Sequence, residues 1–139
     1  MTTRILVPTD FSPYAAAAAD YAVSLAAHSN AELLIAHVKP SAVLPHSEED
    51  VADPLEPELH TKLSAVARNS VGVAVSRRFL RGNPVDELLK LAKETGVRQI
   101  VMGTHGQTMA PEKAIGSIAE AVLLRATCRV ILVKGETPA

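Results

Sequence analysis

Aromatic residues and cysteine are scarce in this chain of 139 residues. Phe, Tyr and Trp make up 3 % of it and Trp is absent, which argues against the exposed rings that bind single-stranded nucleic acid. A single Cys excludes an internal disulfide and a cysteine-based zinc site, and it fits a reducing compartment such as the cytoplasm. Because hydrophobic residues still make up 47 %, the core must be aliphatic and rich in alanine.

Neither sign of charge is in excess, and long apolar runs are missing. The chain has 14 basic and 15 acidic residues and a net charge of −1, whereas domains that bind phosphate backbones usually carry a basic excess. No stretch approaches the roughly 18 apolar residues of a membrane helix. The apolar run at residues 5–7 is too short for a signal peptide. We therefore expect a soluble cytoplasmic protein that binds neither nucleic acid nor membrane.

The length suits one domain that spans residues 1–139. Residues 40–57 differ from the rest, because they hold four of the nine prolines and the acidic cluster Glu48-Glu49-Asp50. We interpret them as an exposed, mobile loop inside this domain and not as a domain boundary.

Short apolar runs alternate with helical spacing along the chain. Ser12-Pro13 and Asn83-Pro84 are typical helix starts, and Gly96 is a typical helix end. The apolar runs at residues 5–7, 33–38, 100–102 and 130–133 are expected to be strands, and so are residues 73–79, where Val73, Val75, Arg77 and Phe79 alternate with period two. Since short, wholly apolar strands are buried on both faces, the pattern predicts an open parallel α/β sheet with helices on both faces.

Two loops after expected strands carry residues suited to a ligand, and ligands in such sheets bind beyond the carboxyl ends of strands. The first loop is Pro8-Thr9-Asp10-Phe11-Ser12, and the second begins at Gly103-Thr104-His105-Gly106 and closes at Gly116-Ser117. Glycines let backbone N–H groups approach a ligand closely, and a helix that starts at Ser117 favours an anion. The second loop could therefore cradle a phosphate chain, although the spacing fits a glycine-hinged loop with a serine helix start equally well.

The spacing Gly103-x2-Gly106-x9-Gly116-Ser117 resembles the ATP-binding signature of the universal stress protein family. Residues 4–12 are similar to the opening strand of that family, residues 101–106 to its fourth-strand loop, and residues 128–133 to its closing strand. The resemblance implies a Rossmann-like fold with strand order 3-2-1-4-5. That order makes the first and fourth strands neighbours, so that Asp10 lies beside the loop at Gly103.

The resemblance also implies a dimeric regulatory protein of the stress response that binds an adenine nucleotide. ATP is the first choice, with ADP or AMP as alternatives, and Mg²⁺ could bridge the phosphates. Asp10 would accept from ribose hydroxyls or adenine, or it would serve only the turn before the helix, and His105 would contact phosphate or remain an exposed loop residue. The implied nucleotide-binding residues are Pro8, Thr9, Asp10, Val38, Met102, Gly103, His105, Gly106, Gly116, Ser117 and Ile118.

One segment departs from the pattern of nucleotide-binding members. Those members often have basic residues and a further glycine after the second motif glycine, where this chain has Gln107, Met109 and Glu112, so that Lys113 is the remaining cation. The alternative function is a protein-interaction module of the same fold with weak or no nucleotide binding. No general base or arginine finger for phosphoryl transfer is evident, and the resemblance implies at most slow ATP hydrolysis or autophosphorylation.

The last strand is expected to form a homodimer. The strand order of the family places it at the sheet edge, where an unpaired apolar strand is an aggregation hazard, and two copies can pair about a two-fold axis. Alternatively, the loop at residues 40–57 covers this edge. The pairing residues are Val130, Ile131, Leu132 and Val133. A downstream protein partner is not identified.

Several further residues are interpreted as structural. The histidines show no metal-ligand spacing, Cys128 reads as a small buried residue, and three arginines read as charges that blunt an edge strand in preference to contacting phosphate. These residues are His28, His37, His46, His60, Cys128, Arg77, Arg78 and Arg81.

Overall fold

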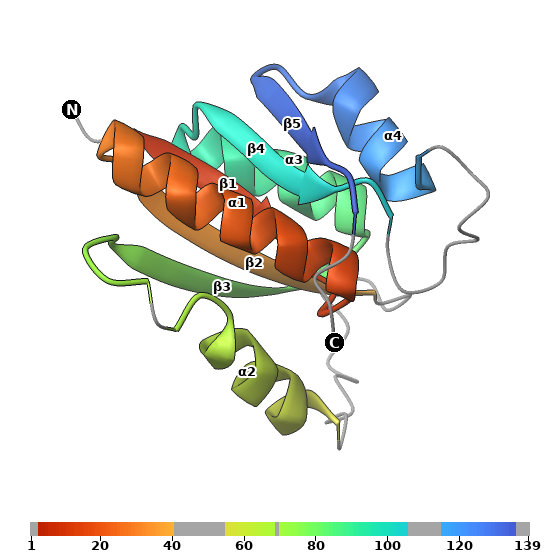
Figure 1. Ribbon diagram of the computed structural model, residues 1–139. Helices are drawn as coiled ribbons and strands as arrows, with labels where there is room; N and C mark the ends of the chain where they lie inside the picture. The colour runs from red at the N-terminus through yellow and green to blue at the C-terminus, as the bar shows by residue number, and fades with distance from the viewer. Residues whose placement is uncertain (1–2, 41–54, 69, 106–114, 136–139) are drawn as a thin grey trace.

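A parallel sheet forms the centre of the computed structural model, which describes residues 3–40, 55–68, 70–105 and 115–135. Within these residues the strands are β1 (Arg4–Pro8), β2 (Glu32–Pro40), β3 (Val75–Gly82), β4 (Gln99–Gly103) and β5 (Arg129–Val133). Their order is β3-β2-β1-β4-β5 (Figure 1), which confirms the order that the resemblance implied. β1 pairs directly with β4, with Leu6 opposite Ile100, so the loops that follow these two strands start side by side.

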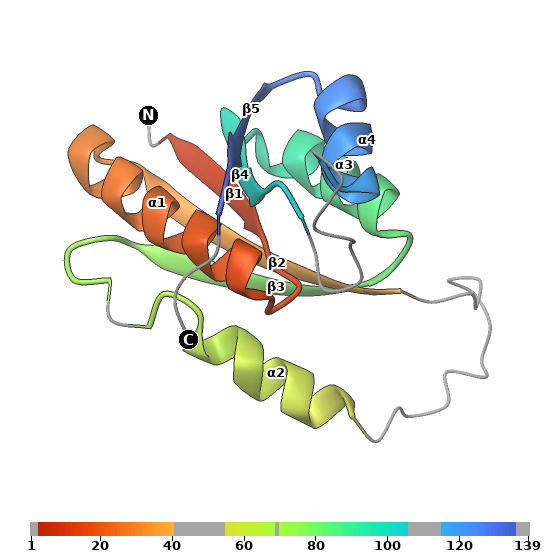
Figure 2. The ribbon, with the colours of Figure 1, turned by 45° about the vertical axis from the view of Figure 1, so that its right-hand side comes forward.

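Helices cover both faces of the sheet, as expected. Within the described ranges they are α1 (Pro13–Ser29), α2 (Glu56–Ala65), α3 (Pro84–Thr95) and α4 (Ser117–Arg125). α1 and α2 lie on one face, and α3 and α4 lie on the other (Figures 1 and 2). No helix in the described part of the chain is long and apolar enough to cross a membrane.

The sheet separates two aliphatic cores, because alternate residues of each strand face opposite sides. In β1, Leu6 belongs to the core under α3 and α4, whereas Ile5 and Val7 belong to the core under α1. Ala18 and Ala22 of α1 are fully buried, and such small side chains let the helix axis approach the sheet closely. The expected alanine-rich core is thus confirmed.

The predicted helix ends are confirmed in detail. The Ser12 hydroxyl accepts from the backbone N–H of Ala15 at 3.1 Å, and the Asn83 side chain accepts from the N–H of Asp86 at 3.0 Å. Gly96 ends α3 in the left-handed conformation, with φ at 64°. These ends depend on residues within one helical turn, which is why local sequence predicts them well.

Several element boundaries differ from the sequence prediction. β3 was expected at residues 73–79 but runs from Val75 to Gly82, because it pairs with β2 along its whole length. The helical spacing of Leu59, Leu63, Val66 and Ala67 predicts a helix through Ala67, but α2 ends at Ala65, and Ala67 has a φ of 56°. Of the expected loop at residues 40–57, Pro40 belongs to β2 and α2 begins at Glu56, whereas residues 41–54 lie outside the described residues.

α2 packs beside the edge strand β3 and is held there at both ends by side chains. Arg77 donates through Nε to the carbonyl of Leu63 at 3.1 Å and through Nη2 to the carbonyl of Val66 at 2.7 Å. A cation is favourable at this end of a helix, where carbonyls lack intrahelical donors. At the other end, Glu56 forms an ion pair with Arg81. These two arginines therefore do more than the expected blunting of a sheet edge.

Replacing Arg77 with Met should destabilise the protein, because the carbonyls at the end of α2 would lose their charged donor. We expect a loss of about 1–3 kcal/mol in the free energy of unfolding, measured by urea denaturation. Arg78→Met is the matched control, because Arg78 is exposed and donates to no carbonyl of α2 in the described part of the chain. Equal losses in both variants would contradict the assignment of Arg77 as the anchor of α2.

Candidate functional site

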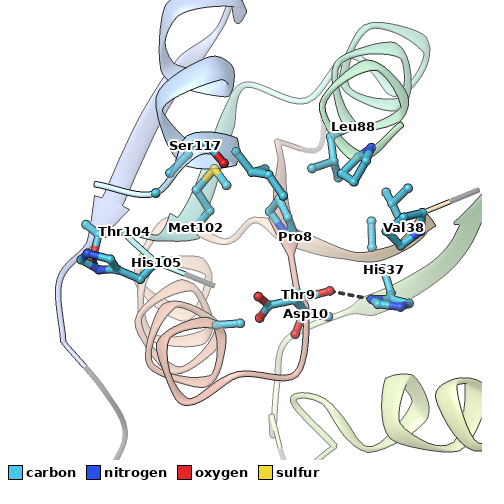
Figure 3. A pocket seen from close by; sticks show the side chains of 18 residues that line it. Pro8, Thr9, Asp10, His37, Val38, Leu88, Met102, Thr104, His105 and Ser117 are labelled. Carbon is cyan, nitrogen blue, oxygen red and sulfur yellow. Dashed lines mark hydrogen bonds between the residues drawn. The ribbon is translucent and has the colours of Figure 1, made fainter. Parts of the chain in front are cut away.

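A pocket of about 300 Å³ opens at the carboxyl end of the sheet, between the ends of β1, β2 and β4 and the starts of α3 and α4 (Figure 3). This is the position expected for a ligand of an open parallel sheet. The residues that line it are Pro8, Thr9, Asp10, Ala15, Ala36, His37, Val38, Pro40, Pro84, Leu88, Met102, Gly103, Thr104, His105, Gly116, Ser117, Ile118 and Ala119. All of the predicted site residues are among them except Gly106, which lies outside the described residues.

The loop after β1 is stabilised by hydrogen bonds between its own residues, each two positions apart in the sequence. The N–H of Phe11 donates to the Thr9 hydroxyl at 3.1 Å, and the N–H of Ser12 donates to Oδ1 of Asp10 at 3.0 Å. Phe11 itself has a φ of 65°, a left-handed conformation that costs about 1–2 kcal/mol in a residue other than glycine. Asp10 therefore does form the turn that the sequence analysis proposed as its alternative role, and the same half-buried residue also lines the pocket.

Gly103 at the end of β4 is required by packing against α1. A β-carbon at this position would lie 2.9 Å from the carbonyl oxygen of Tyr14, which is too close for two non-bonded atoms. The spacing of the motif predicts close approach of a ligand at this glycine, and the structure adds an internal reason for it. Both can hold, because Gly103 also lines the pocket.

His105 lies against α1 and is half-buried. Its ring is 5.2 Å from the ring of Tyr14, measured between centroids, and its Nδ1 is 2.9 Å from the Thr104 hydroxyl. These contacts place the imidazole at the pocket rim. The alternative that His105 is simply an exposed loop residue therefore does not hold, because the residue is half-buried.

The start of α4 borders the same pocket. Gly116 precedes the helix with φ at −75° and ψ at 159°, and its N–H donates to the carbonyl of Thr104 at 2.6 Å. The backbone donors that an α-helix leaves without an intrahelical acceptor therefore belong to the next residues, Ser117 to Ala119. They lie at the positive end of the helix dipole, which favours an anion.

Charge on the described pocket lining is sparse. It contains the carboxylate of Asp10 and no Lys or Arg, so an anion there would depend on backbone N–H groups. No group of His, Cys, Asp and Glu among the described residues could hold a metal ion. Gln107, Met109, Glu112 and Lys113, where the chain departs from the family pattern, lie outside the described residues.

His37 is the main site residue that the sequence analysis missed. It was interpreted as an ordinary strand position, but it is 8 % exposed, lines the pocket, and places Nδ1 2.8 Å from the carbonyl oxygen of Thr9 (Figure 3). The available signal was a polar residue within the apolar run of residues 33–38, since a buried polar group requires a partner. Other lining residues that were not predicted are Ala15, Ala36, Pro40, Pro84, Leu88, Thr104 and Ala119.

Two further histidines interpreted as structural make contacts within or beside their own elements. His28 Nδ1 lies 2.8 Å from the carbonyl of Ser24, and His60 stacks on Phe79 with 4.1 Å between centroids. Burial raises the pKa of the Cys128 thiol, so the thiol stays protonated at neutral pH and is a poor nucleophile. His46 lies outside the described residues.

Comparison with known proteins agrees with this geometry. A model of the universal stress protein family matches residues 1–134. Universal stress protein MJ0531 from Methanocaldococcus jannaschii is 33 % identical over 138 aligned positions, which cover 94 % of this chain and 81 % of that protein. The solved structure of MJ0577, from the same organism, has a TM-score of 0.74 and 31 % identity, and the match covers 99 % of both chains.

A universal stress protein solved in complex with cAMP is similarly close. Its TM-score to this chain is 0.75 at 26 % identity, and the match covers 96 % of this chain and 97 % of that one. The family model extends over nearly all of the sequence, and a relative of more than 30 % identity spans almost the same length. The chain is therefore a member of the universal stress protein family.

Proposed function

We propose that this protein binds an adenine nucleotide in the pocket between β1 and β4 and acts as a regulatory protein of the stress response. The proposal rests on one observation: Asp10 and the start of α4 line the same pocket. A carboxylate suits ribose hydroxyls, and a helix N-terminus suits phosphate. The complex of a related protein with cAMP supports the same ligand class.

The base would lie against the end of β2, which continues beyond β1. The last residue of β1, Pro8, is opposite Ala36, and the N–H of Thr9 still donates to the Ala36 carbonyl at 2.8 Å. Backbone groups of alternate strand residues point to the same side, so the N–H and C=O of Val38 also face the side of β1, past its end. Val38 thus offers a donor and an acceptor to the edge of an adenine, while Leu88 supplies an apolar wall.

The phosphates would lie at the start of α4. The Ser117 hydroxyl and the N–H groups of the first turn are the donors nearest that end of the pocket. Because the described lining contains no Lys or Arg, we propose that Mg²⁺ contributes when ADP or ATP is bound, by bridging phosphate oxygens.

The direct test is to identify and rank the nucleotide. The purified protein is denatured and its supernatant is separated by anion exchange to detect adenine nucleotide, and the protein is then titrated with AMP, ADP and ATP, with and without magnesium, in a thermal-shift assay. Ligand at 100 times its Kd should stabilise the fold by about 2.7 kcal/mol. A folded protein that responds to none of them would favour the alternative of an interaction module.

Replacing Gly116 with Val should weaken binding of every adenine nucleotide by at least about tenfold, which corresponds to roughly 1.4 kcal/mol. The backbone angles of Gly116 suit any residue, so the fold should persist while the branched side chain occupies space at the phosphate end. Calorimetry measures the affinity, and circular dichroism measures the fold. Leu124→Val on the same helix is the control, because Leu124 is 76 % exposed and is not part of the pocket lining. Unchanged affinity in folded Gly116→Val would refute the phosphate position.

Replacing Asp10 with Asn should weaken the binding of AMP, ADP and ATP by similar factors, because all three share the nucleoside that Asp10 is proposed to contact. The amide oxygen of Asn can still accept from the N–H of Ser12, so the turn is preserved. Parallel calorimetric titrations compare the three ligands. A loss confined to ATP would place Asp10 at the phosphates or their metal ion instead.

We propose that the protein forms a homodimer through β5. This strand is at one edge of the sheet, and its four apolar residues Val130–Val133 are only half-buried in the single chain. Ile131 and Val133 pack toward one core, whereas Val130 and Leu132 pack toward the other. Antiparallel pairing of two copies would satisfy both strand edges at once.

Replacing Ile131 with Lys should shift the protein from dimer toward monomer in light scattering, because a charge would be introduced into the proposed strand pair. Val71→Lys is the control, since Val71 is 95 % exposed and precedes the opposite edge strand β3. Circular dichroism reports whether each variant folds. An unsubstituted protein that remains monomeric at high micromolar concentration would rule out the dimer.

A further inference from the structure

We propose that His37 is a positioning residue for the nucleotide pocket, which it serves by holding the two residues on either side of Asp10. The inference rests on the proposed function. His37 lies near the end of β2, next to Val38, and is 8 % exposed. It reaches the loop after β1 through a hydrogen bond on one side and through ring packing on the other (Figure 3).

The hydrogen bond fixes which ring nitrogen carries the proton. Nδ1 lies 2.8 Å from the carbonyl oxygen of Thr9, and a carbonyl oxygen can only accept. Nδ1 must therefore be the donor, so the neutral ring is the Nδ1–H tautomer, the less populated one in free histidine. Because Thr9 is itself buried, its carbonyl would be left without a partner if this donor were removed, which is costly.

Packing against Phe11 completes the contact. The centroids of the His37 and Phe11 rings are 4.5 Å apart, and on its other side His37 is 5.6 Å from the ring of Phe79 on β3. Phe11 is the residue with φ at 65°, so its side chain must be well anchored to maintain this conformation. His37 thus holds the residue before Asp10 by a hydrogen bond and the residue after it by its ring.

Such anchoring matters because a binding carboxylate has to be kept near one geometry. Contacts that fix a site residue within about 0.5 Å decide whether its hydrogen bonds to a ligand are productive. Asp10 has a local support of its own in the N–H of Ser12. That bond lies within the loop and cannot fix the position of the loop relative to β2. The N–H of Thr9 joins the loop to β2 by donating to the Ala36 carbonyl at 2.8 Å, and His37 adds a side-chain connection that also reaches the far side of Asp10.

The test compares His37→Leu with His37→Asn in calorimetric titrations with AMP and ATP. Leu removes the donor, so affinity for both nucleotides should fall by about tenfold, the size of one hydrogen bond to a buried group. The amide N–H of Asn occupies the position of Nδ1–H, so this variant should bind within about threefold of the unsubstituted protein. His60→Leu is the control and should bind normally, because His60 stacks on the same Phe79 but is not part of the pocket lining.

A second measurement does not depend on the folding of any variant. Long-range ¹H–¹⁵N correlation spectra of the unsubstituted protein identify the His37 tautomer, and the Nδ1–H form is expected. The Nε2–H form would overturn the proposal, and so would a folded His37→Leu variant with unchanged affinity while the unsubstituted protein binds. If the unsubstituted protein binds neither AMP nor ATP, the proposed function fails. If it binds them and folded His37→Leu binds equally well, only the positioning role fails, so the two failures are distinguishable.

Discussion

The pairing of β1 with β4 is the constraint on which the pocket depends. β1 is flanked by β2 and β4, and residues 5–9 are buried, so its position cannot shift without disrupting both cores. The chain leaves β1 toward α1 on one face, whereas the segment after β4 leads to α4 on the other. The sheet therefore opens between these two strand ends, and Asp10 and Ser117 come to one cavity although they are far apart in sequence.

The extra length of β2 gives the cavity its second wall. Beyond the end of β1, β2 continues through Val38 to Pro40 and remains paired with β3. The same extension carries His37, the one strong polar group in the buried part of this strand, to the carbonyl of Thr9. Because β2 extends past the end of β1, it offers backbone groups to the proposed ligand and places the His37 side chain against the loop after β1.

The two helices on the α1 face are attached by different forces. α1 buries a stripe of alanines over the centre of the sheet, where the removal of apolar surface from water is the main stabilising contribution. α2 lies beside the edge strand and buries little besides Leu63. Its ends are instead held by Arg77 and by Glu56, the latter also 3.8 Å from Lys39. The central part of the domain therefore depends on packing, and its β3 edge depends on polar contacts.

The local elements of this protein were determined by the sequence alone. Apolar runs predicted four of the strands and period-two alternation predicted β3, while Ser12 and Asn83 predicted helix starts and Gly96 predicted a helix end. Each of these features depends on neighbours within a turn or a strand. The strand order came from resemblance to a family, since nothing local specifies which strands pair. The same resemblance named most of the pocket residues before their geometry was known.

Tertiary structure alone decided the contacts between elements. The donor role of His37 requires β1 and β2 to lie side by side, the need for glycine at position 103 requires the backbone of α1 above β4, and the attachment of Arg77 requires α2 beside β3. In each case the partner lies on another element, and its separation along the sequence does not predict that the two residues are close in space. The sequence could therefore show that a buried histidine needs a partner, but only the folded sheet places the carbonyl of Thr9 within 2.8 Å of it.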